Sequence, residues 1–137
     1  MKKQKQTILF VCVHNSGRSQ MAEAFFNQLA QEKAMAISAG TQPADKVNPV
    51  VVKAMREVNI NISNNKPKLL TMEMVEGADM MITMGCGADA DGVCPAGFIE
   101  SEDWQLDDPR DKDISEVKRI RDEIKNKIVK LVNEITK

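Results

Sequence analysis

A cysteine and an arginine stand six positions apart in the segment CVHNSGRS, which runs from Cys12 to Ser19. A cysteine thiolate is a strong nucleophile, and an arginine guanidinium can bind two oxygens of a tetrahedral oxyanion through paired hydrogen bonds. If the segment joins a strand to a helix, the loop N–H groups and the helix N-terminus also attract an anion. The spacing therefore predicts an oxyanion site beside a nucleophilic sulfur.

Each residue of this loop can be given a part in that site. Cys12 is the predicted nucleophile, since a nearby helix N-terminus and cation favour its ionised form. Gly17 allows a tight turn, and Asn15 and Ser19 can hydrogen-bond the loop and the sulfur. The residues predicted to bind the oxyanion are Val13, His14, Asn15, Ser16, Gly17, Arg18 and Ser19.

Two other interpretations of this segment stay open. Cys12 could be one more small apolar residue at a strand end, with Arg18 a surface charge. His14 is the only histidine and could serve as a general base. A thiolate needs no base, so we expect His14 to order the loop or to add to its positive potential.

An acid for the reaction is expected in the segment LDDPRDKD, where Asp107 and Asp108 precede Pro109. A protonated carboxyl group in a loop over the anion could give its proton to a departing oxygen. We favour Asp108, because the proline restricts the backbone next to it. The alternative is an ordinary acidic turn.

Cys86 and Cys94 are separated by seven residues in a loop rich in Gly, Asp and Ala. The two sulfurs could meet without straining a regular element, which suggests a redox pair. Zinc is a weaker interpretation, because structural zinc takes four ligands and the chain has one histidine. The third interpretation is that the two thiols are buried separately and have no joint function.

Strands and helices alternate along the chain. Buried strands are predicted at 7–13, 34–39 and 79–84, with a fourth at 97–99. The first is followed by a helix to about residue 31, on which Met21, Ala22, Phe25, Phe26 and Leu29 recur at helical spacing, and the second by a helix through residues 51–58. This order predicts an α/β fold, a three-layer sandwich around a four-stranded parallel sheet. Ligands bind at the carboxyl ends of such strands, where the loops with all three cysteines fall.

From about residue 114 the chain is predicted to form a long amphipathic helix. Its apolar residues are three or four positions apart, namely Val117, Ile120, Ile124, Ile128, Leu131 and Ile135. We expect this helix to cover the sheet, with a dimerising coiled coil as the alternative. The protein is accordingly expected to be a monomer.

The composition limits the remaining function classes. A length of 137 residues suits one domain, residues 1–137. With 19 basic and 20 acidic residues the net charge is −1, so no field draws in nucleic acid or an anionic membrane. No apolar run approaches the about 20 residues of a membrane span. Three cysteines do not make a disulfide framework, and we expect a cytoplasmic protein.

Four segments together resemble one family, the thioredoxin-coupled arsenate reductases, which share the low-molecular-weight tyrosine phosphatase fold. They are VCVHNSGRSQMAEAF, SAGT at 38–41, MGCG at 84–87 and DDP at 107–109. The resemblance implies that the Cys12 thiolate attacks arsenate held by the loop and Arg18, while Asp108 protonates the leaving hydroxide. It further implies that Cys86 attacks Cys12 and expels arsenite, that Cys94 attacks Cys86, and that thioredoxin reduces the final disulfide. Detoxification of arsenic would be the purpose.

The chain departs from the family's pattern at three points. It has one more residue between its last two cysteines than relatives usually have, and Gly17 stands where some relatives carry a cysteine. Several relatives bind a potassium ion beside the loop. Asn15, Glu23 and Ser38 match that site, but the acidic residue expected near 61–65 is absent. No bound cofactor is expected, and potassium stays an open question.

Two other functions compete with this interpretation. A low-molecular-weight protein tyrosine phosphatase would use the same loop, but it has no use for Cys86 and Cys94. Recognition of phosphotyrosine also calls for aromatic residues around the cleft. The chain has no tyrosine, and Arg110 and Asp111 occupy the positions where a phosphatase is expected to have aromatic residues. The other alternative is a redox-sensing or anion-binding module that uses the cysteines as a switch and catalyses no turnover, but a sensor would have little use for the Asp-Pro acid.

Overall fold

The structure is a computed structural model that describes residues 6–84, 101–104, 106, 107, 109 and 112–136. Its strands are β1 (Gln6–Cys12), β2 (Ala34–Gly40), β3 (Met80–Thr83) and β4 (Ser101–Asp103). Its helices are α1 (Arg18–Ala30), α2 (Pro49–Glu57), α3 (Met72–Gly77) and α4 (Ile114–Ile135). The predicted alternation of strands and helices is confirmed. Helix α3 was not predicted.

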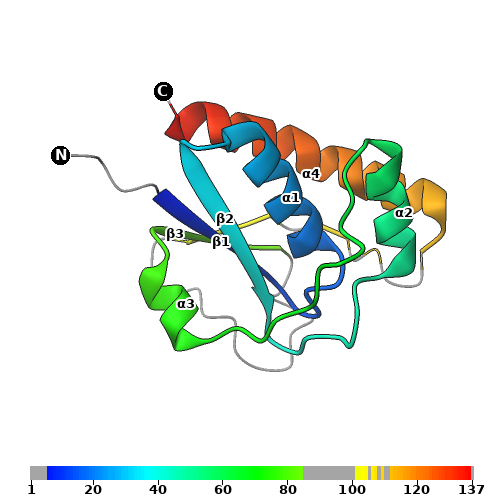
Figure 1. Cartoon of the computed structure of the whole chain (residues 1–137), viewed down its shortest axis with the longest axis horizontal. Coiled ribbons are helices and arrows are strands. Elements are labelled where there is room, and N and C mark those ends of the chain that lie inside the picture. Colours follow the sequence, from blue (N-terminus) through cyan, green and yellow to red (C-terminus); the bar gives the residue numbers. More distant parts are fainter. Residues whose placement is uncertain (1–5, 85–100, 105, 108, 110–111, 137) are drawn as a thin grey trace.

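The strands form one parallel sheet in the order β2-β1-β3-β4 (Figure 1). The three longer strands are β2, β1 and β3, and β4 contributes three residues at the edge. The sequence placed the fourth strand at 97–99, which lies outside the described residues, whereas the described strand begins at Ser101. Strand β1 is central and aligns its last residue, Cys12, with Gly40 at the end of β2.

Strand β1 is buried on both faces, as its apolar sequence predicts, and its side chains alternate between two cores. Ile8, Phe10 and Cys12 face the larger core, with α1, α2 and α4. Leu9 and Val11 face a smaller core that includes residues of α3. The sheet is therefore covered on both faces, with a thick helical layer on one side and a short helix on the other (Figure 1).

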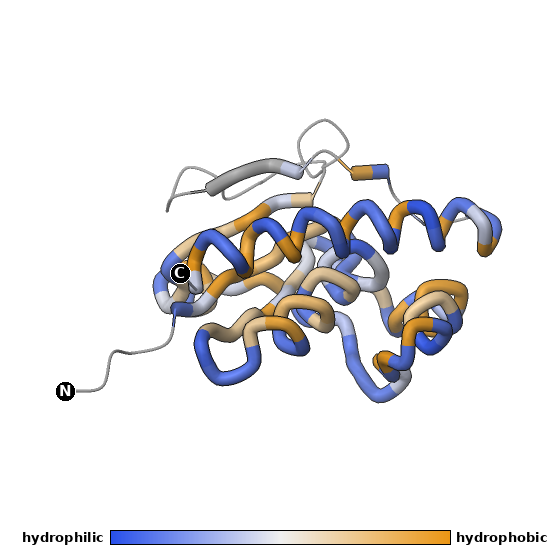
Figure 2. Tube along the Cα trace, turned by 90° about the horizontal axis from the view of Figure 1, so that it is seen from above, coloured by the Kyte–Doolittle hydropathy of each residue, from blue (hydrophilic) through white to orange (hydrophobic). Residues whose placement is uncertain are grey.

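Helix α4 covers the larger core as predicted. Val117, Ile120, Ile124 and Ile128 are fully buried, and polar residues fill the other face of the helix (Figure 2). The prediction for α1 fails at one residue, because Leu29 is 40% exposed near the end of the helix. No helix of the described residues is long and apolar enough to cross a membrane.

Candidate active site

The predicted nucleophile lies where the sequence placed it, at the carboxyl end of the central strand. Cys12 is the last residue of β1, and α1 begins six residues later at Arg18. Residues 13–17 form the connecting turn, called the anion loop below (Figure 1). The Cys12 side chain is 2% exposed. The sulfur thus lies beneath the loop and near the first turn of a helix, as an oxyanion site requires.

The backbone of the anion loop is held by the segment that follows β2. Four carbonyl oxygens at Cys12 and in the loop accept hydrogen bonds of 2.8–3.3 Å from N–H groups of residues 41–48. The pairs are Thr41 to Cys12, Gln42 to Val13, Ala44 to His14 and Asn48 to Ser16. In a trans peptide the N–H points opposite to the C=O. These carbonyls face outward, so the N–H group of each of the same peptide units faces the inside of the loop, where an anion would bind.

Two hydrogen-bond donors reach the Cys12 sulfur. The backbone N–H of Asn15 lies 3.2 Å from Sγ, and the Ser19 hydroxyl oxygen lies 2.9 Å from it. Ser19 Oγ also accepts a bond of 2.6 Å from Asn15 Nδ2. Its own proton can therefore be donated to the sulfur, and both contacts are of the kind that a thiolate accepts.

Asn15 is the fully buried centre of this network. Its side-chain oxygen accepts from the backbone N–H of Lys68 at 2.8 Å and from the Gln20 amide at 3.2 Å. Its backbone has a φ of 50°, a left-handed conformation that asparagine tolerates better than most residues. The side chain thus bonds both the nucleophile's partner Ser19 and the distant segment around Lys68.

Two glycines allow close packing around the loop. A Cβ atom on Gly40 would lie 2.6 Å from the Val13 carbonyl oxygen and 2.9 Å from the Asn15 nitrogen. A Cβ atom on Gly17 would lie 2.7 Å from Pro109 Cγ. Gly40 therefore lets β2 approach the anion loop, and Gly17 leaves room for Pro109 to pack on it.

Arg18 is buried and bonds two backbone carbonyls far away in the sequence. Its Nη1 donates to the oxygen of Met84 at 2.6 Å and to that of Leu106 at 3.2 Å. The predicted anion-binding side chain thus also connects the loop to the end of β3 and to the segment before Asp107. Its bidentate contact with an oxyanion stays a prediction.

The other predicted catalytic residues, Asp108, Cys86 and Cys94, lie outside the described residues. Two neighbours of Asp108 are described. Pro109 is buried against Gly17, whereas the Asp107 carboxylate is exposed and pairs with Arg119 at 2.8 Å. The hydrogen bonds that Arg119 donates to Asp107 and to Glu116 raise the pKa of Arg119.

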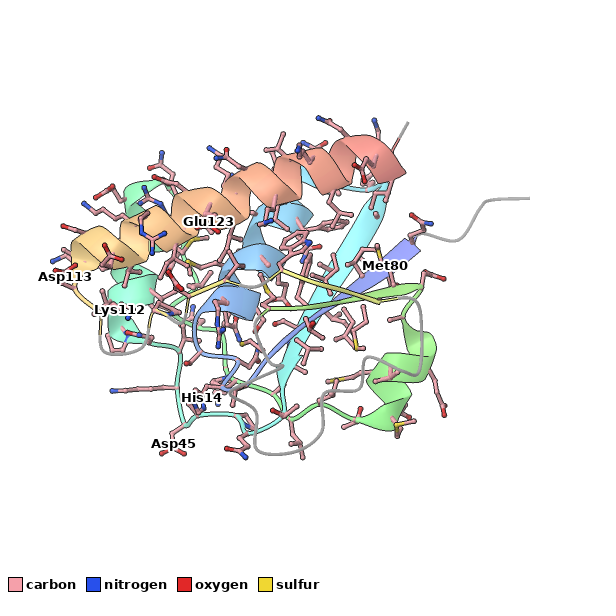
Figure 3. The ribbon with its side chains drawn as sticks, turned by 180° about the vertical axis from the view of Figure 1, so that it is seen from behind. His14, Asp45, Met80, Lys112, Asp113 and Glu123 are labelled. Carbon is pink, nitrogen blue, oxygen red and sulfur yellow. The ribbon has the colours of Figure 1, made fainter. Side chains whose placement is uncertain are left out.

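The His14 side chain contacts the segment that follows β2, and its part in ordering the loop stays a prediction. Its Nδ1 lies 3.2 Å from the Gln42 carbonyl oxygen, which can only accept, so Nδ1 is the protonated nitrogen in this contact. His14 and Asp45 both line a cavity of about 400 Å³ beside the loop, and both lie at this end of the molecule (Figure 3).

The three residues matched to a potassium site lie at the base of the loop. Ser38 Oγ donates to Glu23 Oε1 at 3.1 Å, and Asn15 lies in the anion loop, three residues before α1 begins. Sequence reasoning missed Lys68, whose ammonium lies 3.5 Å from the same Glu23 oxygen. No pattern marked this residue, because it lies in a polar loop far away in the sequence. Among the described residues, no three His, Cys, Asp or Glu side chains gather as for a metal ion.

Fold and site together define a class. A family model for the low molecular weight phosphotyrosine protein phosphatases matches residues 7–137, and the chain belongs to that family. This result confirms the resemblance that the four sequence segments indicated.

Within the family, its relatives include arsenate reductases. One from Staphylococcus epidermidis is 44% identical over 124 residues, which cover 89% of this chain and 92% of that protein. A thioredoxin-dependent arsenate reductase of Corynebacterium glutamicum is 34% identical with a TM-score of 0.76; the match covers 97% of this chain but 62% of that longer one. An arsenate reductase solved in the phosphate binding state is 31% identical with a TM-score of 0.83, and the match covers 95% and 98% of the two chains.

Proposed function

We propose that this protein reduces arsenate to arsenite, with Cys12 as the nucleophile and thioredoxin as the reductant. The observation that carries the proposal is the anion loop itself. The loop carbonyls accept hydrogen bonds from residues 41–48, outside the loop. Two donors lie within 3.2 Å of the buried Cys12 sulfur. Arsenate is a tetrahedral oxyanion of the size and charge that such a loop binds. The names of the relatives support arsenate as the substrate.

In the first step the Cys12 thiolate attacks the arsenic atom and a sulfur–arsenic bond forms. The bond from arsenic to one hydroxyl group breaks, and this group leaves as water after it takes a proton, for which Asp108 is the proposed donor. Two contacts support this choice: Pro109 packs on the anion loop at Gly17, and the Asp107 carboxylate is paired with Arg119 on the surface.

In the second step Cys86 attacks the Cys12 sulfur. The electron pair of the sulfur–arsenic bond goes to arsenic, which falls from the pentavalent to the trivalent state and leaves as arsenite. A Cys12–Cys86 disulfide remains, so the two thiols have supplied the two electrons. Cys94 then attacks Cys86 and releases the Cys12 thiolate, and a dithiol of the thioredoxin class reduces the Cys86–Cys94 disulfide.

The test of this proposal follows NADPH oxidation in a mixture of protein, arsenate, thioredoxin and thioredoxin reductase. We expect sustained oxidation that stops when any component is omitted. Cys12→Ser should abolish it, because serine is not ionised at neutral pH. Cys94→Ser should release about one arsenite per protein and then stall, because the first disulfide is not passed on. Multiple turnovers by Cys94→Ser with thioredoxin alone would rule out the relay.

A low-molecular-weight tyrosine phosphatase is the second candidate, favoured by the description of the matching family model. Such an enzyme would form a phosphocysteine at Cys12 and hydrolyse it with water. Brisk hydrolysis of an aryl phosphate, without arsenate-dependent NADPH oxidation, would select this function over the reductase.

A further inference from the structure

One of the three residues that match the relatives' potassium site, Glu23, already contacts an ammonium group. Glu23 Oε1 accepts a hydrogen bond from Ser38 and lies 3.5 Å from Lys68 Nζ. The Glu23 side chain is 16% exposed, so this contact is partly shielded from water. The Lys68 ammonium is therefore already paired with Glu23, which is the one carboxylate among the three matched residues.

The donor set does not fit a potassium ion. The side-chain oxygen of Asn15 accepts two hydrogen bonds, from Lys68 N and from Gln20 Nε2. The Ser38 hydroxyl donates its proton to Glu23. A cation here would lie beside the Lys68 ammonium, and two positive charges at about 4 Å repel each other.

We infer that the Lys68 ammonium takes the place of the cation and that Lys68 is a positioning residue for the anion loop. It bonds three separate parts of the site. Its N–H donates to Asn15 at 2.8 Å, its C=O accepts from Gly40 at 2.8 Å, and its ammonium pairs with Glu23. The ammonium thus fixes the segment that orients the Asn15 amide.

The contacts lead from Lys68 to the nucleophile in three steps. Asn15 accepts from Lys68 and donates to Ser19, and Ser19 lies 2.9 Å from the Cys12 sulfur. The Lys68 side chain is 44% exposed, so its ion pair by itself is weak. Its effect is expected in the geometry of the loop, and therefore in oxyanion affinity. Potassium should make no difference to the natural protein.

The experiment measures the affinity for inorganic phosphate from the rise in Tm with phosphate concentration, in potassium chloride and in choline chloride of equal ionic strength. The wild-type protein should give the same affinity in both salts. Lys68→Met keeps the unbranched stem of the side chain as far as Cε and removes the charged ammonium group. In both salts it should bind phosphate about threefold more weakly, the size expected of one exposed charge pair, because the Asn15 and Ser38 oxygens stay engaged and offer potassium no site.

Two control variants separate positioning from a general loss of charge. Lys68→Arg keeps a cation beside Glu23 and should bind phosphate as the wild type does. Lys66→Met removes an exposed lysine two residues earlier and should leave the affinity unchanged.

Tighter phosphate binding by the wild type in potassium than in choline would overturn the inference, and this comparison needs no variant to fold. Equal losses in Lys68→Met and Lys66→Met would also overturn it. The inference rests on the oxyanion site of the proposed function but not on arsenate reduction, so a protein without reductase activity can still pass or fail this test.

Discussion

Two polar clusters join distant segments of the chain, and they differ in their access to water. Around the anion loop, Asn15 is fully buried and bonds Ser19, Gln20 and the backbone of Lys68. Between α2 and α4, Arg121 donates to the Ala54 carbonyl and pairs with Glu57, whose side chain is about half exposed (49%).

This difference decides how well water can replace a hydrogen-bond partner that is lost from each cluster. A buried donor that loses its acceptor finds no water in its place, so the full desolvation penalty remains. At the α2–α4 cluster, water and salt can take over most of the lost interaction. The same kind of side-chain change should therefore have large effects at the anion loop and small ones at the helix surface.

The largest effect is expected from Asn15→Ala. The change removes the acceptor of the Lys68 N–H and one of the acceptors of the Gln20 amide, and it places alanine at a φ of 50°. We expect a loss of about 3 kcal/mol in the free energy of unfolding, measured by urea denaturation. Phosphate binding should fall with it, because Ser19 loses the donor that orients it.

Asn133→Ala provides the matched control, since Asn133 is exposed on α4. Alanine has the higher helix propensity, so this variant should be at least as stable as the wild type. If both alanine variants unfold at the same urea concentration, burial of the Asn15 network does not have the effect argued above.

A smaller but still clear effect is expected from Gly40→Ala. The new Cβ would lie 2.6 Å from the Val13 oxygen and 2.9 Å from the Asn15 nitrogen. Moving these atoms would disturb the bond from Gln42 to Val13 and the bond from Asn15 to the Cys12 sulfur. Overpacking of this kind destabilises by about 2 kcal/mol. Gly77→Ala is the control, because a Cβ there meets no atom within 4 Å. Equal Tm values for the two variants would contradict the close approach at Gly40.

The contrast between the two clusters also explains what the sequence could predict. The burial of β1 and the helical spacing of α1 and α4 come from local apolar patterns, so the fold and the position of Cys12 were predictable. The segment CVHNSGRS likewise carries its own chemistry within eight residues.

Other parts of the site depend on contacts between distant residues. Lys68 acts on Asn15 from 53 positions away, and Arg18 bonds Met84 from 66 positions away. No periodicity marks such pairs. Helix α3 has six residues, which are too few to show an apolar pattern. The one sequence signal for its start is Thr71, whose side chain accepts a hydrogen bond from the backbone N–H of Met74. Glu23 is half-buried on α1 and accepts a hydrogen bond from Ser38, 15 positions away.

The smallest effect is expected at the exposed cluster, from Glu57→Gln. Hydrogen bonds from Lys118 and Arg121 lower the pKa of Glu57 below its usual 4.5. A carboxyl group with a lowered folded-state pKa stabilises the fold above its unfolded pKa, and this contribution is lost as the pH falls through the folded-state value. The variant should therefore melt about 1 °C below the wild type at pH 7, and the two should converge once the pH falls below the lowered pKa of Glu57. Glu76→Gln, at an exposed position of α3, should show no such pH-dependent difference. A gap in Tm that persists in acid would mean that Glu57 acts through packing rather than through its charge.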